Sequence, residues 1–130
     1  MRIATVIDPA LNFVRAYSAA EIIIGERILR TSIVVTARNL IADWPPRSIA
    51  DLTQTHLAAV FALGPQVVLL GTGARQRFPE ARILAAAARA GIGLEVMDTA
   101  AACRTYNVLL AEERQVAAAL ILEGDLQADR

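Results

Sequence analysis

From residue 51 onward, segments with helical spacing alternate with short apolar runs, and this alternation constrains the fold more than any other feature. The run "QVVLLG" follows the first helical segment, and two more helix-then-strand units come after it. A continuous apolar run of this length suits a strand that is covered on both faces. The predicted strands are residues 66–71, 94–98 and 114–122. This order predicts a sheet with helices packed against it and right-handed crossovers.

The first predicted helix, residues 51–64, carries signals at both ends. Its apolar residues recur near helical spacing. Thr53 or Asp51 is expected as the N-cap, because both side chains can accept a hydrogen bond from the first turn. Gly64 followed by Pro65 is expected to end the helix.

Two further helices follow in the same half of the chain. The second, residues 78–91, has Pro79 near its first position and Gly91 as its terminating glycine. The third, residues 99–113, is expected to begin with Thr99 as its N-cap.

Residues 12–43 are rich in β-branched residues, which favour strands. Residues 21–35, "EIIIGERILRTSIVV", predict a hairpin with its turn near Gly25 and Glu26. Residues 14–17 and 38–44 are predicted as flanking strands. The block ends at two consecutive prolines, positions 45 and 46, because proline cannot donate a ladder hydrogen bond.

These elements together predict an α/β fold, a three-layer sandwich with a mixed central β-sheet. An N-terminal β-rich block comes first, and α-β-α-β-α-β follows it. An open parallel sheet with a separate hairpin is a close alternative. The length is typical of one domain, so residues 1–130 are predicted to form a single domain with a sizeable core.

Composition and charge exclude several functions. All 13 basic residues are Arg, so no lysine is available for a Schiff base or for the phosphate-binding loop of a P-loop protein. The 13 acidic residues balance them, and this neutrality argues against a nucleic-acid partner. A hydrophobic content of 55% predicts a folded core and excludes a disordered chain.

The sequence is also typical of a cytoplasmic protein. The single cysteine, Cys103, cannot form an internal disulfide, so nothing points to an oxidising compartment. Asp8 and Pro9 interrupt the apolar core that a signal peptide needs. No stretch reaches the roughly 20 apolar residues that span a bilayer, so no membrane span is expected.

Two loops follow predicted parallel strands, at residues 69–82 and 96–104, and they are expected to lie side by side. The first contains "GTG", Gly71 to Gly73, and then Arg75. Backbone amides and arginine here would suit a small anion or a carboxylate of a partner protein. The third glycine of a dinucleotide fingerprint is absent. A tight strand-to-helix connection with solvated arginines is the structural alternative.

The stretch "CRTYN", residues 103–107, is the most polar run of the last predicted helix. Cys103 lies one turn from the helix start, where a thiol pKa can be lowered. The only histidine, His56, belongs to a different predicted helix, so a buried and inert cysteine is favoured. Asn107 lies on the same side as Cys103, and its amide is expected to bond to the backbone of a neighbouring loop. The run is therefore predicted to be a polar clamp before it is a catalytic set.

A candidate binding pocket between the two loops follows from these observations. Its predicted residues are Gly71, Thr72, Gly73, Arg75, Thr99, Cys103 and Asn107. One His and one Cys among scattered carboxylates predict no metal site, no cofactor and no catalytic triad.

The run "GIGLEVMDTAAACRTYNVLLAEERQVAAALI", preceded by "LLGTG", resembles the Mth938-like domain family over roughly residues 12–122. The pattern E-x-M-x-T-x-x-A-C-x-T-Y-N, which begins at Glu95, carries the likeness. The resemblance implies a three-layer α/β fold. It also implies relatives that include a mitochondrial assembly factor for respiratory complex I and an adipogenesis-associated protein. It supplies no catalytic residue.

Three hypotheses about function are left open. The first is a non-enzymatic assembly or interaction factor that docks onto another protein, as the resemblance implies. The second is a small-molecule or anion-binding protein, or an enzyme, with its site between the GTG loop and the "MDT" helix start. The third is redox sensing by Cys103, which requires an exposed sulfur and a lowered pKa. A homo-oligomer is a further option, since "VAAALIL" suits either a core strand or a dimer edge.

Overall fold

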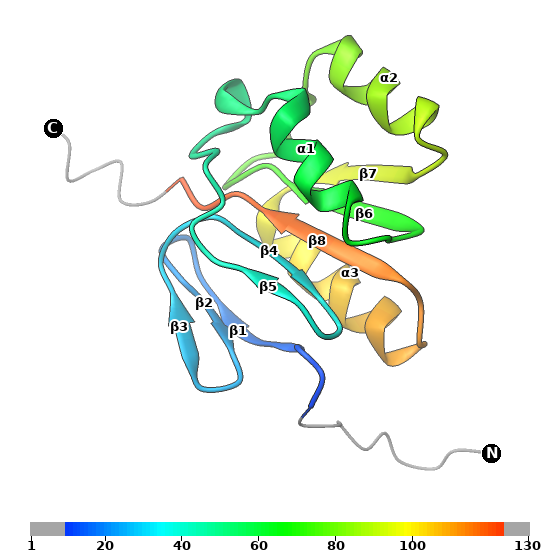
Figure 1. Ribbon diagram of the computed structural model, residues 1–130. Coiled ribbons are helices and arrows are strands. Elements are labelled where there is room, and N and C mark those ends of the chain that lie inside the picture. Colours follow the sequence, from blue (N-terminus) through cyan, green and yellow to red (C-terminus); the bar gives the residue numbers. More distant parts are fainter. Residues whose placement is uncertain (1–9, 124–130) are drawn as a thin grey trace, which may run out of the picture.

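The computed structural model describes residues 10–123 (Figure 1). The segment on which the signal-peptide expectation rests, residues 1–9, lies outside the described residues. The strands are β1 (Val14–Tyr17), β2 (Ile22–Ile24), β3 (Arg27–Leu29), β4 (Ile33–Thr36), β5 (Leu40–Ile41), β6 (Val67–Gly71), β7 (Gly93–Met97) and β8 (Val116–Leu120). The helices are α1 (Gln54–Phe61), α2 (Ala81–Arg89) and α3 (Thr99–Ala111), with a short 3₁₀ turn over Ile49–Asp51.

The strands form two sheets. The central sheet has five strands in the order β5-β4-β8-β6-β7, and the small sheet has the order β1-β2-β3. In the central sheet β8, β6 and β7 run parallel, whereas β4 is antiparallel to both β5 and β8. The mixed central sheet predicted from the alternation of elements is therefore confirmed.

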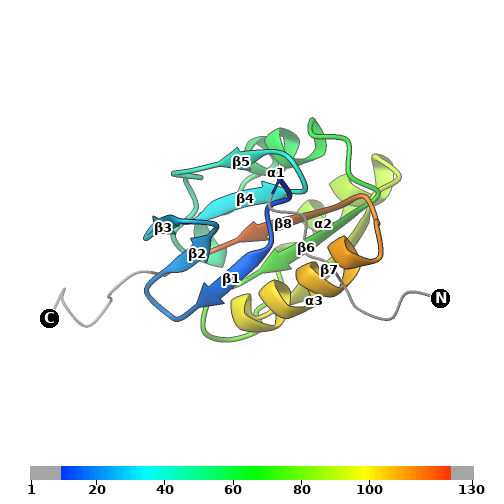
Figure 2. The same cartoon turned by 90° about the horizontal axis from the view of Figure 1, so that it is seen from below.

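Both faces of the central sheet are covered by other elements. Helices α1 and α2 lie on one face, and α3 lies beside the small sheet on the other (Figures 1 and 2). Two apolar clusters fill the two interlayer spaces. Tyr106 belongs to the cluster under α3, and Trp44 belongs to the cluster under α1. This arrangement confirms the predicted three-layer sandwich.

The middle strand β8 is built from small side chains. All five of its residues are buried, and its central three are alanines. Ala118 packs in the cluster under α3, while Ala117 and Ala119 pack in the cluster on the other face. Alanine has low strand propensity, so pairing with β4 and β6 holds this segment extended. The segment is a core strand and not a dimer edge.

The predicted hairpin over residues 21–35 is only partly correct. Strands β2 and β3 form a hairpin, but β4 leaves it and joins the central sheet. Ser32 marks the change: its buried hydroxyl donates to the Pro46 carbonyl and accepts the Leu122 N–H at 2.9 Å. This side chain supplies bonds that a continuous ladder would otherwise provide.

The predicted flanking strand at residues 38–44 is reduced to the two residues of β5. Asp43, two residues beyond it, has φ of 56°, a left-handed conformation that cannot continue a strand. The other predicted flanking strand, residues 14–17, is confirmed as β1.

Helix starts agree with the sequence at one site and differ at two. Thr53 caps α1 as predicted, with its hydroxyl accepting the His56 N–H. Helix α3 is capped by Asp98, whose carboxylate accepts the Ala101 N–H at 2.8 Å, and not by Thr99. Helix α2 begins at Ala81, two residues after the predicted Pro79. Within the described part of the chain, no helix is long and apolar enough to cross a membrane.

Candidate functional site

The two predicted loops meet at the carboxyl ends of β6 and β7, which are adjacent parallel strands. The Gly73 N–H donates to the Thr99 hydroxyl oxygen at 2.8 Å, and the Thr99 N–H donates to the Gly73 carbonyl at 2.9 Å. The Thr99 hydroxyl in turn donates to the Ile121 carbonyl at 2.8 Å. Thr99 thus joins the GTG loop, α3 and the end of β8, and the predicted side-by-side placement is confirmed.

The glycines of the GTG loop make room for the chain's own residues. A Cβ atom on Gly71 would lie 2.9 Å from the Thr99 Cα, which is too close for any side chain. Gly73 has φ of +100°, and a Cβ there would run into the carboxylate of Glu123. Gly71 is therefore required by close packing against the α3 backbone, and Gly73 by its backbone conformation.

The carboxylate of Glu123 occupies the position where the sequence predicted a small anion or a partner carboxylate. The Ala74 N–H donates to Glu123 Oε1 at 3.0 Å. Glu123 follows β8 and is 49 residues away from Ala74. Sequence reasoning missed this contact because Glu123 lies beyond the last predicted strand and no local signal links it to the loop.

Thr72 closes the loop from inside. Its hydroxyl is buried, donates toward the Arg75 carbonyl and accepts the Arg77 N–H at 3.0 Å. The side chain of Arg75 is exposed, so only its carbonyl takes part in this loop. These bonds fit the structural alternative, a tight connection with solvated arginines.

The polar residues of α3 fasten β1 and the segment before it to the helix. The Asn107 amide donates to the Val14 carbonyl at 2.8 Å, and its oxygen accepts the Val14 N–H at 2.9 Å. The Tyr106 hydroxyl donates to the Asn12 carbonyl at 2.7 Å. These contacts confirm the predicted clamp, although its target is a strand rather than the expected loop.

Cys103 is fully buried between α3 and the central sheet. Burial raises the pKa of its thiol to about 12, because the thiolate would lose its hydration, and neighbouring Arg104 offsets this only in part. The structure therefore supports an inert cysteine. The redox-sensing hypothesis is contradicted, because it required an exposed sulfur with a lowered pKa.

The seven predicted site residues lie in three different places. Gly71, Thr72, Gly73 and Thr99 are together at the GTG loop, with the Arg75 backbone beside them. Asn107 belongs to the clamp on β1, and Cys103 is enclosed within the core. The clamp and the loop are separate structures on opposite halves of α3.

His56 has a structural role. Its Nδ1 accepts the Thr53 N–H at 3.1 Å, which completes a reciprocal cap at the start of α1. Its carbonyl accepts the indole N–H of Trp44 at 3.3 Å. Among residues 10–123, no group of three or more His, Cys, Asp and Glu side chains could hold a metal ion.

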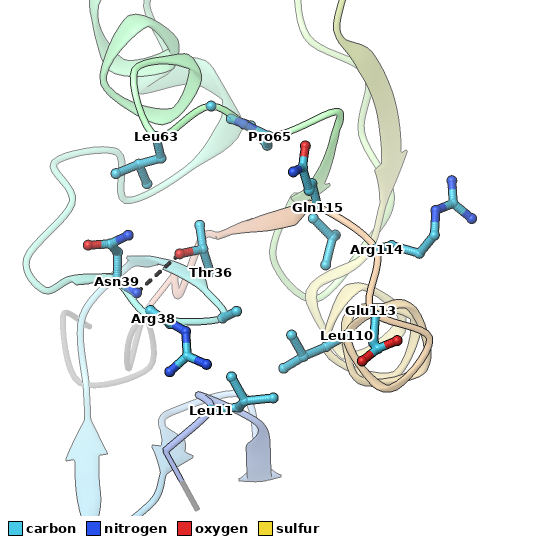
Figure 3. Close-up of a pocket in the computed structure, with 13 residues that line it drawn as sticks. Leu11, Thr36, Arg38, Asn39, Leu63, Pro65, Leu110, Glu113, Arg114 and Gln115 are labelled. Atoms are coloured by element: carbon cyan, nitrogen blue, oxygen red, sulfur yellow. Dashed lines mark hydrogen bonds between the residues drawn. The ribbon is translucent and has the colours of Figure 1, made fainter. Parts of the chain in front are cut away.

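A cavity of about 410 Å³ lies at the opposite end of the sheet (Figure 3). Leu11, Leu63 and Leu110 contribute to its walls, together with the side chain of Arg38. Glu113, with φ of 63°, lies on its rim. Sequence reasoning missed this cavity because its lining comes from segments that are distant in the chain.

The fold and these contacts define a class: a three-layer α/β domain whose polar helix residues secure an N-terminal β unit and whose glycine loop holds an internal carboxylate. The family model described as "Protein of unknown function (DUF498/DUF598)" matches residues 14–121. The chain belongs to this family.

Solved structures agree with this membership. A Xanthomonas campestris protein is 42% identical with a TM-score of 0.81, and the match covers 95% of both chains. A Bordetella pertussis protein described as a Mth938-like domain is 30% identical with a TM-score of 0.82, covering 100% of this chain and 98% of that one. The resemblance to the Mth938-like family is thereby confirmed.

Curated relatives carry two kinds of name. NADH dehydrogenase [ubiquinone] 1 alpha subcomplex assembly factor 3 is 42% identical in Danio rerio, over 62% of this chain and 48% of that protein. The Bos taurus protein of the same name is 30% identical, over 88% and 62%. The "13 kDa major membrane protein" of Francisella tularensis is 36% identical, over 56% and 59%. The chain thus spans about half to three-fifths of these relatives' lengths.

Proposed function

We propose that this protein is a non-enzymatic assembly factor that docks onto other proteins during biogenesis of respiratory complex I, the NADH:ubiquinone oxidoreductase. The observation that carries the proposal is the similarity to proteins named as assembly factors of that complex, which for the Bos taurus protein extends over 117 residues. The cytoplasmic location expected from the sequence is part of the proposal, and fractionation of host cells tests it.

The polar residues of α3 are occupied within the protein itself, which supports a protein that acts through its surface rather than through a catalytic centre on this helix. Cys103 is enclosed, and Tyr106 and Asn107 are bonded to backbone groups of the N-terminal segment. Large apolar side chains are exposed instead at Ile28 and Phe78, with 49% and 67% of their surface accessible. Contiguous apolar patches mark docking surfaces, whereas single exposed apolar residues are common on any protein, so these two side chains add no separate argument for docking.

Affinity capture combined with gene deletion tests the proposal. A tagged chain expressed at native level in its host is expected to enrich subunits of NADH:ubiquinone oxidoreductase over an equally abundant tagged control. Deletion of the gene is expected to reduce fully assembled complex on native gels, and the wild-type gene should restore it. Normal amounts of assembled complex after deletion would exclude the proposed role.

A second candidate, anion binding at the GTG loop, is favoured by one observation: the loop already holds a carboxylate through the Ala74 N–H. An external anion must displace Glu123, so a Glu123→Gln variant is expected to bind inorganic phosphate more tightly than the wild type. The Ala74 amide resonance reports this binding in an NMR titration. Unchanged Ala74 resonances in both proteins at high millimolar phosphate would eliminate this candidate.

A further inference from the structure

Strand β7 is an outer strand of the central sheet, and its backbone direction can be assigned residue by residue (Figure 1). The Gly93 N–H donates to the Gln66 carbonyl at 3.1 Å, and the Met97 carbonyl accepts the Thr72 N–H at 2.9 Å. Positions 93, 95 and 97 therefore direct their backbone groups toward β6. Because alternate residues face opposite ways, Leu94 and Val96 direct theirs to the outer edge.

The outer edge is only partly satisfied within the described residues. The Val96 carbonyl accepts a hydrogen bond from the side-chain amide of Gln76 at 2.9 Å. No strand of residues 10–123 pairs with this edge, so the N–H groups of Leu94 and Val96 have no ladder partner there. An unpaired edge of this kind is a template for an added strand. The Gln76 amide occupies the place of one donor from such a strand.

The charge at the edge indicates the chemistry of the occupant. Glu95 is exposed and takes part in neither of the two ion pairs found in the described chain, Arg30–Glu21 and Arg82–Glu80. Its backbone faces β6, so against an antiparallel strand it would form a non-hydrogen-bonded pair, in which opposite side chains lie closest. A Lys or Arg at the opposite position is therefore electrostatically complementary.

A second copy of the chain fits this edge poorly. The antiparallel register that uses all five residues of β7 pairs position 93 with 97, and position 94 with 96. It also pairs Glu95 with the same residue of the other copy. Like charges directly opposite each other destabilise a strand pair. Any other symmetric register leaves part of the five-residue strand unpaired.

We propose that the outer edge of β7 binds an extended segment of a partner protein as an antiparallel strand that carries Lys or Arg opposite Glu95. The inference rests on the proposed docking function and names the surface that performs it. The added strand bonds to the backbone of Leu94 and Val96 and displaces the Gln76 amide. The partner residues on either side of that Lys or Arg are expected to be β-branched, because such residues favour the extended conformation of a strand.

A peptide titration tests the edge directly and without any host protein. The probes are two capped seven-residue peptides of alternating Thr and Val, one with Lys and one with Glu at the centre. The Lys peptide is expected to shift the amide resonances of Leu94 and Val96 and to bind about fivefold more tightly than the Glu peptide. A Glu95→Lys variant should reverse the preference. Equal binding of both peptides, or shifts confined to other surfaces, would overturn the proposal.

The same edge is tested in the captured complex with a matched pair of variants. Val96→Pro removes the outward N–H group. Val96→Ala shortens the side chain but keeps that N–H group. Because proline is tolerated at a strand edge, both variants are expected to keep the wild-type circular dichroism spectrum. Capture of complex I subunits should fall about tenfold with Val96→Pro relative to Val96→Ala.

The possible results separate the two proposals. If the wild type captures those subunits and Val96→Pro captures them equally well, the edge is not the docking surface and the assembly role stands. If the wild type captures none while the peptide titration succeeds, the assembly role fails and the strand-binding edge stands. A stable dimer in sedimentation, with the Leu94 and Val96 amides protected from hydrogen exchange, would show that a second copy covers the edge. That result would overturn the proposal that a partner protein binds there.

Discussion

Removal of the Asn107 amide should loosen the attachment of β1 to α3. An Asn107→Ala variant loses two hydrogen bonds, at 2.8 and 2.9 Å, to the carbonyl and N–H of Val14. Val14 is only 5% exposed, so water cannot fully replace them. Two shielded backbone groups at about 1–2 kcal/mol each predict a loss of about 2–4 kcal/mol in the free energy of unfolding. That is a large part of the roughly 5–15 kcal/mol typical of a domain.

Urea unfolding and hydrogen exchange check this value. The Val14 amide should lose protection more than the amides of β6, because the small sheet can detach while the central sheet remains folded. An Arg104→Ala variant is the control on the same helix. Within residues 10–123 its guanidinium makes one solvent-exposed hydrogen bond, to the hydroxyl of the half-buried Tyr17, so the variant should unfold like the wild type. A loss below about 0.5 kcal/mol for Asn107→Ala, with the Val14 amide still protected, would refute the reasoning.

An Asn107→Asp variant adds a pH test of the same contact. Its carboxylate could still accept the Val14 N–H but would also face the Val14 carbonyl without a donor. The folded-state pKa of the introduced carboxyl should therefore lie above its unfolded value of about 3.9. Relative to the wild type at each pH, the variant should regain stability as pH falls, because the protonated carboxyl can donate again. A constant difference across pH would contradict this orientation.

Three further outcomes are expected. Cys103 should react with a thiol reagent only after unfolding. Burial raises the pKa of its thiol to about 12 in the folded protein, whereas in the unfolded chain the thiol ionises near pH 9. The free energy of unfolding, measured by urea titrations at stepped pH, should therefore decline from about pH 9 toward 12 because only the unfolded chain ionises there. Gly73→Ala should lower the unfolding free energy by about 1–3 kcal/mol, and Glu123→Ala in the same chain should recover only the part due to the clash with the carboxylate. Glu113→Gly should raise the thermal midpoint, with a gain of up to about 1 kcal/mol, because it relieves a φ of 63°.

The half of the fold with regular alternation was predictable because each element carried its own signals. Helix α1 had a cap at Thr53, and β6 was a continuous apolar run. The division of residues 21–35 between two sheets was not predictable in the same way. Strands β3 and β4 are both short and rich in aliphatic residues, and the change of sheet between them depends on Ser32 bonding to Pro46 and Leu122, which are distant in sequence.

In the candidate site, too, features with a local sequence signal were predictable and contacts between distant segments were not. The clamp was foreseen because a polar side chain on the buried side of a helix must find a hydrogen-bond partner. The start of α3 was wrongly assigned to Thr99, because its hydroxyl bonds to Gly73 and Ile121 instead of capping the helix. Glu123 at the GTG loop and the cavity near Arg38 depend on contacts between distant segments, for which a single sequence carries no local signal.

The three central alanines of β8 give the domain an uneven tolerance to mutation. Both faces of this strand are already packed, and a methyl group is the whole side chain at each position. Truncation has little left to remove there, whereas any enlargement must push a neighbouring layer away from the sheet. In a saturation library, β8 should therefore reject larger apolar residues as well as charged ones, so the small side chains of this strand keep the layers on both sides close to the sheet.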